Sequence, residues 1–277
     1  MARLFGLIGN RADLAPRVLA FEREALRVRA RNAPLGWGIG FYQSGEVLLQ
    51  RRPKRPTEDV DFYKIVSDLR TDVLVGHVRH ATVGAVKNEN AHPFRFRSWL
   101  FAHHGTVPGW ASVAERVTAE TPDFLRRNIR GQTDSEHVFH LLLGFLHEGN
   151  RIDDPTTSTA HVAQALGRTA SVLERIAPGS ASDLDLVVTN GRVLVGLRRG
   201  KPMYVQRTSG VRDCPVCREA EVTGRPTKRI DHEHLRGATL VCDVESPLAA
   251  PWEEVPDGHV IAVHHDLRVD FAPLPTT

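Results

Sequence analysis

The sequence predicts an α+β protein in which two β-sheets pack face to face with helices on the outside. Strand-like apolar runs gather towards both ends of the chain, and helical periodicity gathers in the middle. Neither glycine-rich phosphate loop of the nucleotide-binding folds is present. A chain of 277 residues with 41% hydrophobic content can bury one large core, so we expect a single domain over residues 1–277.

The first elements are two strand regions and two helices. Residues 2–9 form a short apolar run that is typical of a central strand. Residues 14–29 and 58–70 carry apolar residues at helical spacing, which predicts amphipathic helices. Residues 36–52 read as two strands around a Ser44-Gly45 turn, and this predicts a hairpin.

The stretch from residue 73 to residue 110 predicts a binding pocket. Its apolar runs VLVGHV and WLFAHH are strand-like, and a polar segment rich in turn-forming residues separates them. Five histidines lie from His77 to His104, and Arg79 lies among them, where side chains at strand ends and in loops usually face a pocket. The histidines lack a pair at diagnostic metal-binding spacing, which favours a polar network over a metal centre.

Beyond the pocket stretch, the chain predicts two more helices and then strands. Residues 137–147 and 161–176 have helical patterns, and Thr133 with Glu136 predicts a capping box before the first of them. Residues 184–200 contain two apolar runs around Asn190-Gly191, which predicts a hairpin with a type I′ turn. Four further strand-like runs follow: MYVQR, ATLVCDV, HVIAVHH and LRVDF.

Composition narrows the class of partner and the compartment. The net charge of +3 is too small to indicate nucleic acid, and it slightly favours an anionic small ligand. The chain has no 18-residue apolar run and no signal-peptide pattern, so we expect a cytoplasmic protein without a membrane partner. Three cysteines do not form a secreted disulfide framework. Assembly into a homo-oligomer stays open.

A second chemical motif lies in residues 208–236, which we expect to be an insert. Cys214 and Cys217 form a Cys-x2-Cys pair, and His232 and His234 follow as a His-x-His pair. This pattern resembles structural zinc spacing, although the histidines are closer together than usual. The motif therefore has two interpretations: a structural zinc site, or a loop with reduced thiols or a reversible disulfide.

Several short motifs occur in a specific order over most of the chain. They are Arg3-Leu4-Phe5-Gly6, Gly36-Trp37-Gly38-Ile39-Gly40, His77-Val78-Arg79, Asn90, His92-Pro93-Phe94, Phe101-Ala102-His103, Gly105 and Thr133-Asp134-Ser135-Glu136. Together they resemble a class II glutamine amidotransferase domain of the N-terminal nucleophile hydrolase superfamily, in its single-domain form. The resemblance implies a four-layer αββα sandwich of two antiparallel sheets between helical layers, with no required cofactor.

The resemblance also implies roles for individual residues. Arg79 would clamp the α-carboxylate of a glutamine-like substrate through its planar fork, and Asp134 would hold the α-ammonium group. His92 joins the substrate-binding set through its motif. Gly105 would donate a backbone N–H to the oxyanion of the tetrahedral intermediate.

The chain departs from the family where the reaction takes place. The family uses an N-terminal cysteine, whose thiol attacks the amide and whose α-amine is the base, but this chain has Ala2. His104 replaces the usual oxyanion asparagine and can still donate a hydrogen bond, while Gly36 replaces an acidic residue. Deliberate replacement of the thiol would explain Ala2 alone, whereas the joint changes favour natural divergence.

Two classes of function follow from the resemblance and the departures. In the first, the chain is a glutamine amidotransferase-like protein whose family hydrolyses a glutamine or γ-glutamyl amide, and the missing nucleophile leaves it impaired or inactive. In the second, it is a non-catalytic binding or regulatory protein. The inherited pocket would then recognise a γ-glutamyl or amide-bearing small molecule, or a protein partner.

Overall fold

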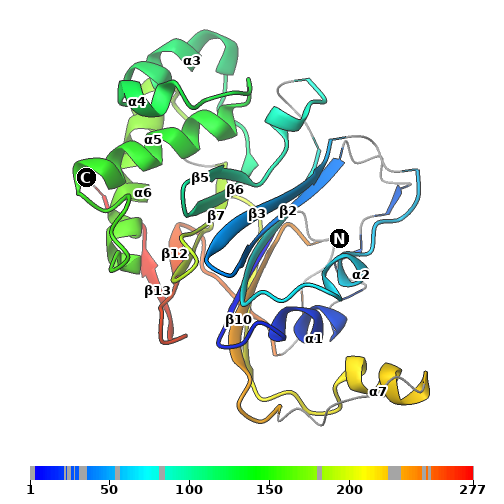
Figure 1. Cartoon of the computed structure of the whole chain (residues 1–277). Coiled ribbons are helices and arrows are strands. Elements are labelled where there is room, and N and C mark those ends of the chain that lie inside the picture. Colours follow the sequence, from blue (N-terminus) through cyan, green and yellow to red (C-terminus); the bar gives the residue numbers. More distant parts are fainter. Residues whose placement is uncertain are drawn as a thin grey trace.

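The computed structural model describes residues 4–21, 23, 26–27, 29–30, 36–53, 57–80, 85–179, 183–223, 232–244, 248 and 251–276 (Figure 1). Within them, two antiparallel sheets pack face to face, and helices cover the outer face of each sheet. The predicted α+β class and the four-layer αββα sandwich are confirmed. None of the described helices is long and apolar enough to cross a membrane.

The first sheet has the strand order β11-β9-β10-β1-β4-β2-β3. Its strands are β1 (Leu4–Gly9), β2 (Gly36–Gln43), β3 (Glu46–Arg52), β4 (Val73–Arg79), β9 (Met203–Ser209), β10 (Arg236–Cys242) and β11 (Glu253–Glu254). β1 lies inside the sheet, with Leu4 opposite His77 of β4 on one side and Cys242 of β10 on the other. The predicted central position of this strand is confirmed.

The second sheet has the strand order β13-β12-β8-β7-β6-β5. Its strands are β5 (Phe94–Phe96), β6 (Trp99–Gly105), β7 (Leu184–Thr189), β8 (Leu194–Leu197), β12 (His259–Val263) and β13 (Val269–Pro273). The hairpin predicted around Asn190-Gly191 forms, but the type I′ turn is wrong. Thr189 pairs with Leu194, which leaves a four-residue connection in which Asn190 Oδ1 accepts from the backbone N–H of Val193.

The helices divide between the two outer faces, as Figure 1 shows. α1 (Leu14–Phe21) and α2 (Phe62–Val66) cover the first sheet, and α7 (Pro215–Val222) packs against α1. α5 (Asp134–Glu148) and α6 (Thr159–Ile176) cover the second sheet, with α3 (Trp110–Ala119) and α4 (Asp123–Arg126) packed beside them. A short 3-10 helix, η2 (Asn88–Asn90), lies between β4 and β5.

Three buried apolar layers hold the four structural layers together. The layer between the sheets contains Leu4 and Val75 from the first sheet and Leu100 and Val187 from the second. The other two layers bury α1 and α2 against the first sheet, and α5 and α6 against the second. Since alternate residues of a strand face opposite sides of a sheet, Leu4 faces the inter-sheet layer while Phe5 faces α2.

Several predicted helix boundaries are wrong. The helix predicted over residues 14–29 ends at Phe21, and the one predicted over 58–70 shortens to Phe62–Val66. α3 is absent from the sequence prediction because Gly109, its N-cap in left-handed conformation, provides no side-chain cap. Elements that begin or end without cap or turn chemistry leave no boundary signal in the sequence.

Candidate functional site

A small cavity lies where β4, β6 and the first turn of α5 meet. We call it the histidine pocket, and its lining residues are His77, Arg79, His80, His92, His103, His104, Gly105, Thr133, Asp134 and Ser135. β4 and β6 belong to different sheets, so the pocket lies at one end of the interface between them. Its volume is about 40 Å³, which is room for about three water molecules.

Arg79 ends β4 and is buried, with 4% of its surface exposed. Its Nη1 donates to the carbonyl oxygen of Ala85 at 3.1 Å, and Asn90 Nδ2 donates to the same oxygen at 2.9 Å. Burial lowers the pKa of Arg79 from its ordinary value, yet a guanidinium remains charged at any physiological pH. The pocket therefore holds a buried positive charge that hydrogen bonds keep in place.

Asp134 begins α5 and is buried beside the same cavity. Its Oδ2 accepts from the backbone N–H of Val107 at 2.8 Å, and its Oδ1 accepts from that of Ser135 at 2.8 Å. A carboxylate offers about four acceptor positions, and Ser135 Oγ also donates to Oδ1 at 3.4 Å, so Oδ2 keeps a position for a hydrogen bond from a ligand. The carboxylate thus fastens the loop after β6 to the start of α5 and still faces the pocket.

The capping box predicted from Thr133 and Glu136 is only half formed. Thr133 Oγ1 accepts from the backbone N–H of Glu136 at 3.3 Å, as the prediction requires. The Glu136 carboxylate instead accepts from the backbone N–H groups of Arg130, at 3.0 Å, and Gly131, at 2.6 Å. The segment before α5 therefore folds back over the helix start, and this holds Asp134 at the pocket wall.

The rings of His77 and His92 are in contact in the pocket, with centroids 4.1 Å apart and planes tilted by 35°. Both are buried, and burial lowers the pKa of each well below 6.5, so both rings are neutral at pH 7. In the described part of the chain, His77 Nδ1 and both ring nitrogens of His92 have no hydrogen-bond partner. Buried polar atoms in this state are rare in folded proteins, and these three nitrogens are available for hydrogen bonds to a ligand.

His104 and Gly105 end β6 at the pocket. His104 Nε2 lies 3.2 Å from Asp243 Oδ2, in the residue that follows β10, so an aspartate outside the predicted site orients this ring. A Cβ at position 105 would lie 2.0 Å from the carbonyl oxygen of Asp183, which makes glycine obligatory there. The predicted oxyanion roles of both residues stay predictions, and Ala2 lies outside the described residues.

Ser135 is a pocket residue to which the sequence assigned no chemistry. Its Oγ lies 2.9 Å from His103 Nδ1, and both side chains are buried. Burial lowers the pKa of His103, while the nearby Asp134 partly offsets that shift. A hydroxyl beside a neutral imidazole is a nucleophile–base arrangement, and only the fold brings together residues 32 positions apart.

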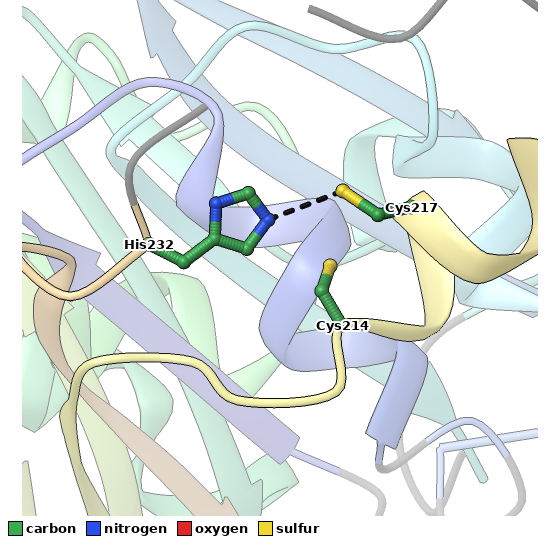
Figure 2. A group of neighbouring side chains, drawn as sticks. All are labelled: Cys214, Cys217 and His232. Atoms are coloured by element: carbon green, nitrogen blue, oxygen red, sulfur yellow. Dashed lines mark hydrogen bonds between the residues drawn. The ribbon is translucent and has the colours of Figure 1, made fainter. Parts of the chain in front are cut away.

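The pocket histidines do not converge on one point. Among the described residues, the one group of three His, Cys, Asp or Glu ligand atoms within 4.8 Å of one another is Cys214, Cys217 and His232. We call this group the Cys–His cluster (Figure 2). His234, predicted as a fourth ligand, lies outside the cluster: a turn between His232 and Leu235 leaves its side chain exposed.

Comparisons with known proteins establish the family of this chain. The family described as class-II glutamine amidotransferases matches residues 1–274. The chain belongs to this family. In Escherichia coli, YafJ is 36% identical over 114 residues, which are 39% of this chain and 41% of YafJ. In Mycobacterium tuberculosis, a gamma-glutamyl-hercynylcysteine sulfoxide hydrolase is 34% identical over 73 residues, which are 26% of this chain and 31% of the relative.

One solved structure is similar to this chain over almost its whole length. A class-II domain protein from Silicibacter pomeroyi superimposes with a TM-score of 0.60 over 99% of both chains, at 17% identity. At that identity the likeness concerns the fold alone. The two curated relatives align over less than half of their own lengths, so their activities are not transferred with the family.

Proposed function

We propose that the histidine pocket binds the amino-acid end of glutamine or of a γ-glutamyl compound, and that hydrolysis of the bound amide is impaired. One observation carries the proposal: Arg79 and Asp134, of opposite charge and both buried, line the same small cavity. An α-amino acid carries a carboxylate and an ammonium group on one carbon. A buried guanidinium and a buried carboxylate provide the complementary pair.

The neutral histidines supply the uncharged part of the recognition. A neutral imidazole offers one donor and one acceptor, and a carboxamide needs both kinds of partner. The unpartnered ring nitrogens of His77 and His92 therefore suit an amide. Since the cavity is only about 40 Å³, we expect its wall to move when a complete amino acid enters.

The proposed impairment follows from the positions of the thiols. The chain has three cysteines, at positions 214, 217 and 242, and none lines the pocket. Cys242 is buried between the sheets, where burial raises the pKa of its thiol well above the ordinary value. Its sulfur therefore remains protonated, and a protonated thiol is a poor nucleophile. Ala2, at the family's nucleophile position, offers only a methyl group.

A second candidate function rests on Ser135 and His103. Their 2.9 Å contact would allow His103 to take the hydroxyl proton while Ser135 attacks the amide. Slow release of ammonia by the unmodified chain, lost in Ser135→Ala, would favour this hydrolase. The first proposal expects binding without such release. For either function we propose a cytoplasmic location, where the three free cysteines would stay reduced.

Calorimetry on the full chain tests the proposed binding. We expect glutamine, glutamate or a γ-glutamyl dipeptide to bind, and Arg79→Ala to weaken that binding by about 30-fold, or ~2 kcal/mol, through loss of a charged hydrogen-bond pair. Arg51→Ala is the matched control, because Arg51 Nη1 also donates to a backbone carbonyl, that of Ala91, but lies outside the pocket. Equal affinity in Arg79→Ala and the unmodified chain would exclude the carboxylate clamp.

A further inference from the structure

The Cys–His cluster brings together two segments of the connection between β9 and β10. Cys214 immediately precedes α7, Cys217 lies in its first turn, and His232 follows shortly before β10 begins at Arg236. Figure 2 shows Cys217 Sγ facing His232 Nε2. These two atoms are 3.2 Å apart, and all three donor atoms lie within 4.8 Å of one another. Three soft or borderline donors therefore face a single point.

The spacing of these donors fits a tetrahedral ion. Zinc binds thiolate sulfur at about 2.3 Å and imidazole nitrogen at about 2.0–2.1 Å, so a sulfur and a nitrogen on one tetrahedral zinc are about 3.6 Å apart. The observed 3.2 Å separation of Cys217 Sγ and His232 Nε2 differs from this by a few tenths of an ångström. Small side-chain shifts suffice to form the first coordination bonds.

A cation already contacts all three donors. Arg17 Nη1 lies 3.2 Å from Cys214 Sγ, 3.2 Å from Cys217 Sγ and 2.9 Å from His232 Nε2. The three donor atoms lie within 4.8 Å of one another, so the Arg17 Nη1 atom, at 2.9 to 3.2 Å from each of them, lies above the plane that they define. The Arg17 nitrogen thus covers the open face of the donor triangle, where a fourth ligand of a tetrahedral ion would lie.

We propose that Cys214, Cys217 and His232 bind one Zn²⁺ ion, and that the Arg17 guanidinium moves aside when the metal binds. Two thiolates and one imidazole form a donor set that zinc prefers. A guanidinium cannot coordinate zinc because it carries no free lone pair at physiological pH. Arg17 stays anchored through Asp13, whose Oδ2 lies 3.2 Å from its Nε, so only the far end of the side chain has to move.

The zinc site would have a structural role, remote from the histidine pocket. All three ligands lie in the β9–β10 connection, so the ion would fasten the start of α7 to the segment just before β10, beside α1, against which α7 packs. The two sites also lie at opposite ends of β1. The strand begins at Leu4, which pairs with His77 of the pocket, and ends at Gly9. The next residue, Asn10, bonds to His234 and Arg236 near the cluster. The ion would therefore not contact a ligand in the pocket.

Metal analysis of the full chain, purified without chelating resin, tests the assignment. We expect one zinc per chain, and its loss in Cys214→Ala, Cys217→Ala and His232→Ala. His234→Ala is the matched histidine control and keeps the metal, because that side chain lies outside the cluster. Replacing zinc by cobalt should give the strong visible absorption of a tetrahedral thiolate site, and that spectrum should be unchanged in Arg79→Ala.

Removing the competing cation gives an independent test. Arg17→Met keeps a long apolar stem but removes the charge, so we expect a lower dissociation constant for zinc. Metal-free chain whose Cys214 and Cys217 resist thiol reagents until reduced would overturn the proposal in favour of a disulfide. Retention of zinc by His232→Ala would also overturn it, and circular dichroism would show that each variant is folded.

Discussion

The histidine pocket and the Cys–His cluster use the same residue type in opposite ways. The pocket gathers five histidines from strand ends and loops. Among the described residues, however, their ring nitrogens belong to no group of three ligand atoms close enough to hold one metal ion. The cluster has a single histidine, and its donor atom meets two sulfurs and a guanidinium. The number of histidines thus says little about metal binding. The convergence of donor atoms decides it.

The two sites also differ in what surrounds them. The pocket lies between the sheets of a fold that the class-II glutamine amidotransferases share, and its charged members are buried. The cluster lies on the connection between β9 and β10, with two of its three members half-buried. We therefore expect changes at the pocket to alter ligand chemistry and acid stability, and changes at the cluster to alter only metal content and local order.

Position 2 should give the largest effect. Ala2→Cys restores the family's thiol, and we expect release of ammonia from glutamine at a rate well above that of the unmodified chain. Adding His104→Asn should raise the rate further, because it restores the family's oxyanion donor. The measurement is an ammonia assay on chains whose removal of Met1 mass spectrometry has verified. Glutamine binding without ammonia release in both variants would show that the pocket no longer aligns the amide.

Acid should destabilise the folded chain through the buried histidines of the pocket. His77 and His92 are neutral in the folded chain because burial lowers their pKa well below 6.5, whereas in the unfolded chain each takes up a proton near pH 6.5. The unfolded state thus binds more protons at low pH, and stability falls as the pH drops below 6.5. We expect a loss of about 1.4 kcal/mol per histidine by pH 5.5, measured by urea unfolding.

The variant that checks this origin is His92→Gln, in which the acid loss should shrink by the share of one histidine, about 1.4 kcal/mol by pH 5.5. His147→Gln, at an exposed position of α5, is the control and should leave the pH profile unchanged. Cys217→Ala should also leave it unchanged, which separates the pocket from the cluster. An identical slope in His92→Gln and the unmodified chain would assign the acid lability to another group.

The cap of α5 should give the smallest effect. Thr133→Ala removes the hydroxyl that accepts from the backbone N–H of Glu136, and we expect a loss of about 1 kcal/mol in the free energy of unfolding. Because Thr133 also lines the pocket and α5 carries Asp134, ligand affinity should fall with it. Thr133→Ser retains the cap and serves as the control. Zinc content should not change in either variant.

The sequence predicted the fold well where local chemistry and long-range pattern coincide. Ser44 and Gly45 both adopt positive φ angles, and the hairpin predicted there forms with Gln43 opposite Glu46. β1 could be recognised as a central strand because its apolar run has no alternation. α5 was recognisable from its apolar content, although its capping glutamate bonds to the preceding segment instead.

Contacts between distant segments could not be predicted. Arg17 and Cys214 are separated by 197 positions, and nothing in either local sequence indicates that they meet. His104 and Asp243 form a pair only because β1 and β4 bring β10 to the pocket end of the sandwich. The Cys-x2-Cys motif was recognisable from spacing, but the choice of His232 over His234 depends on a turn that spacing does not specify.

The strand pairing on both sides of β1 restricts the substitutions that this protein can accept during evolution. Residues Leu4 to Ile8 are paired with both neighbouring strands and are almost completely buried, so substitutions there disrupt folding. At Leu4, the first described residue, both partners are already in place: Cys242 of β10 and His77 of β4. Selection for a stable fold therefore acts on this strand directly, separately from selection on the charged side chains of the pocket. The scaffold and the chemistry that it carries can change at different rates.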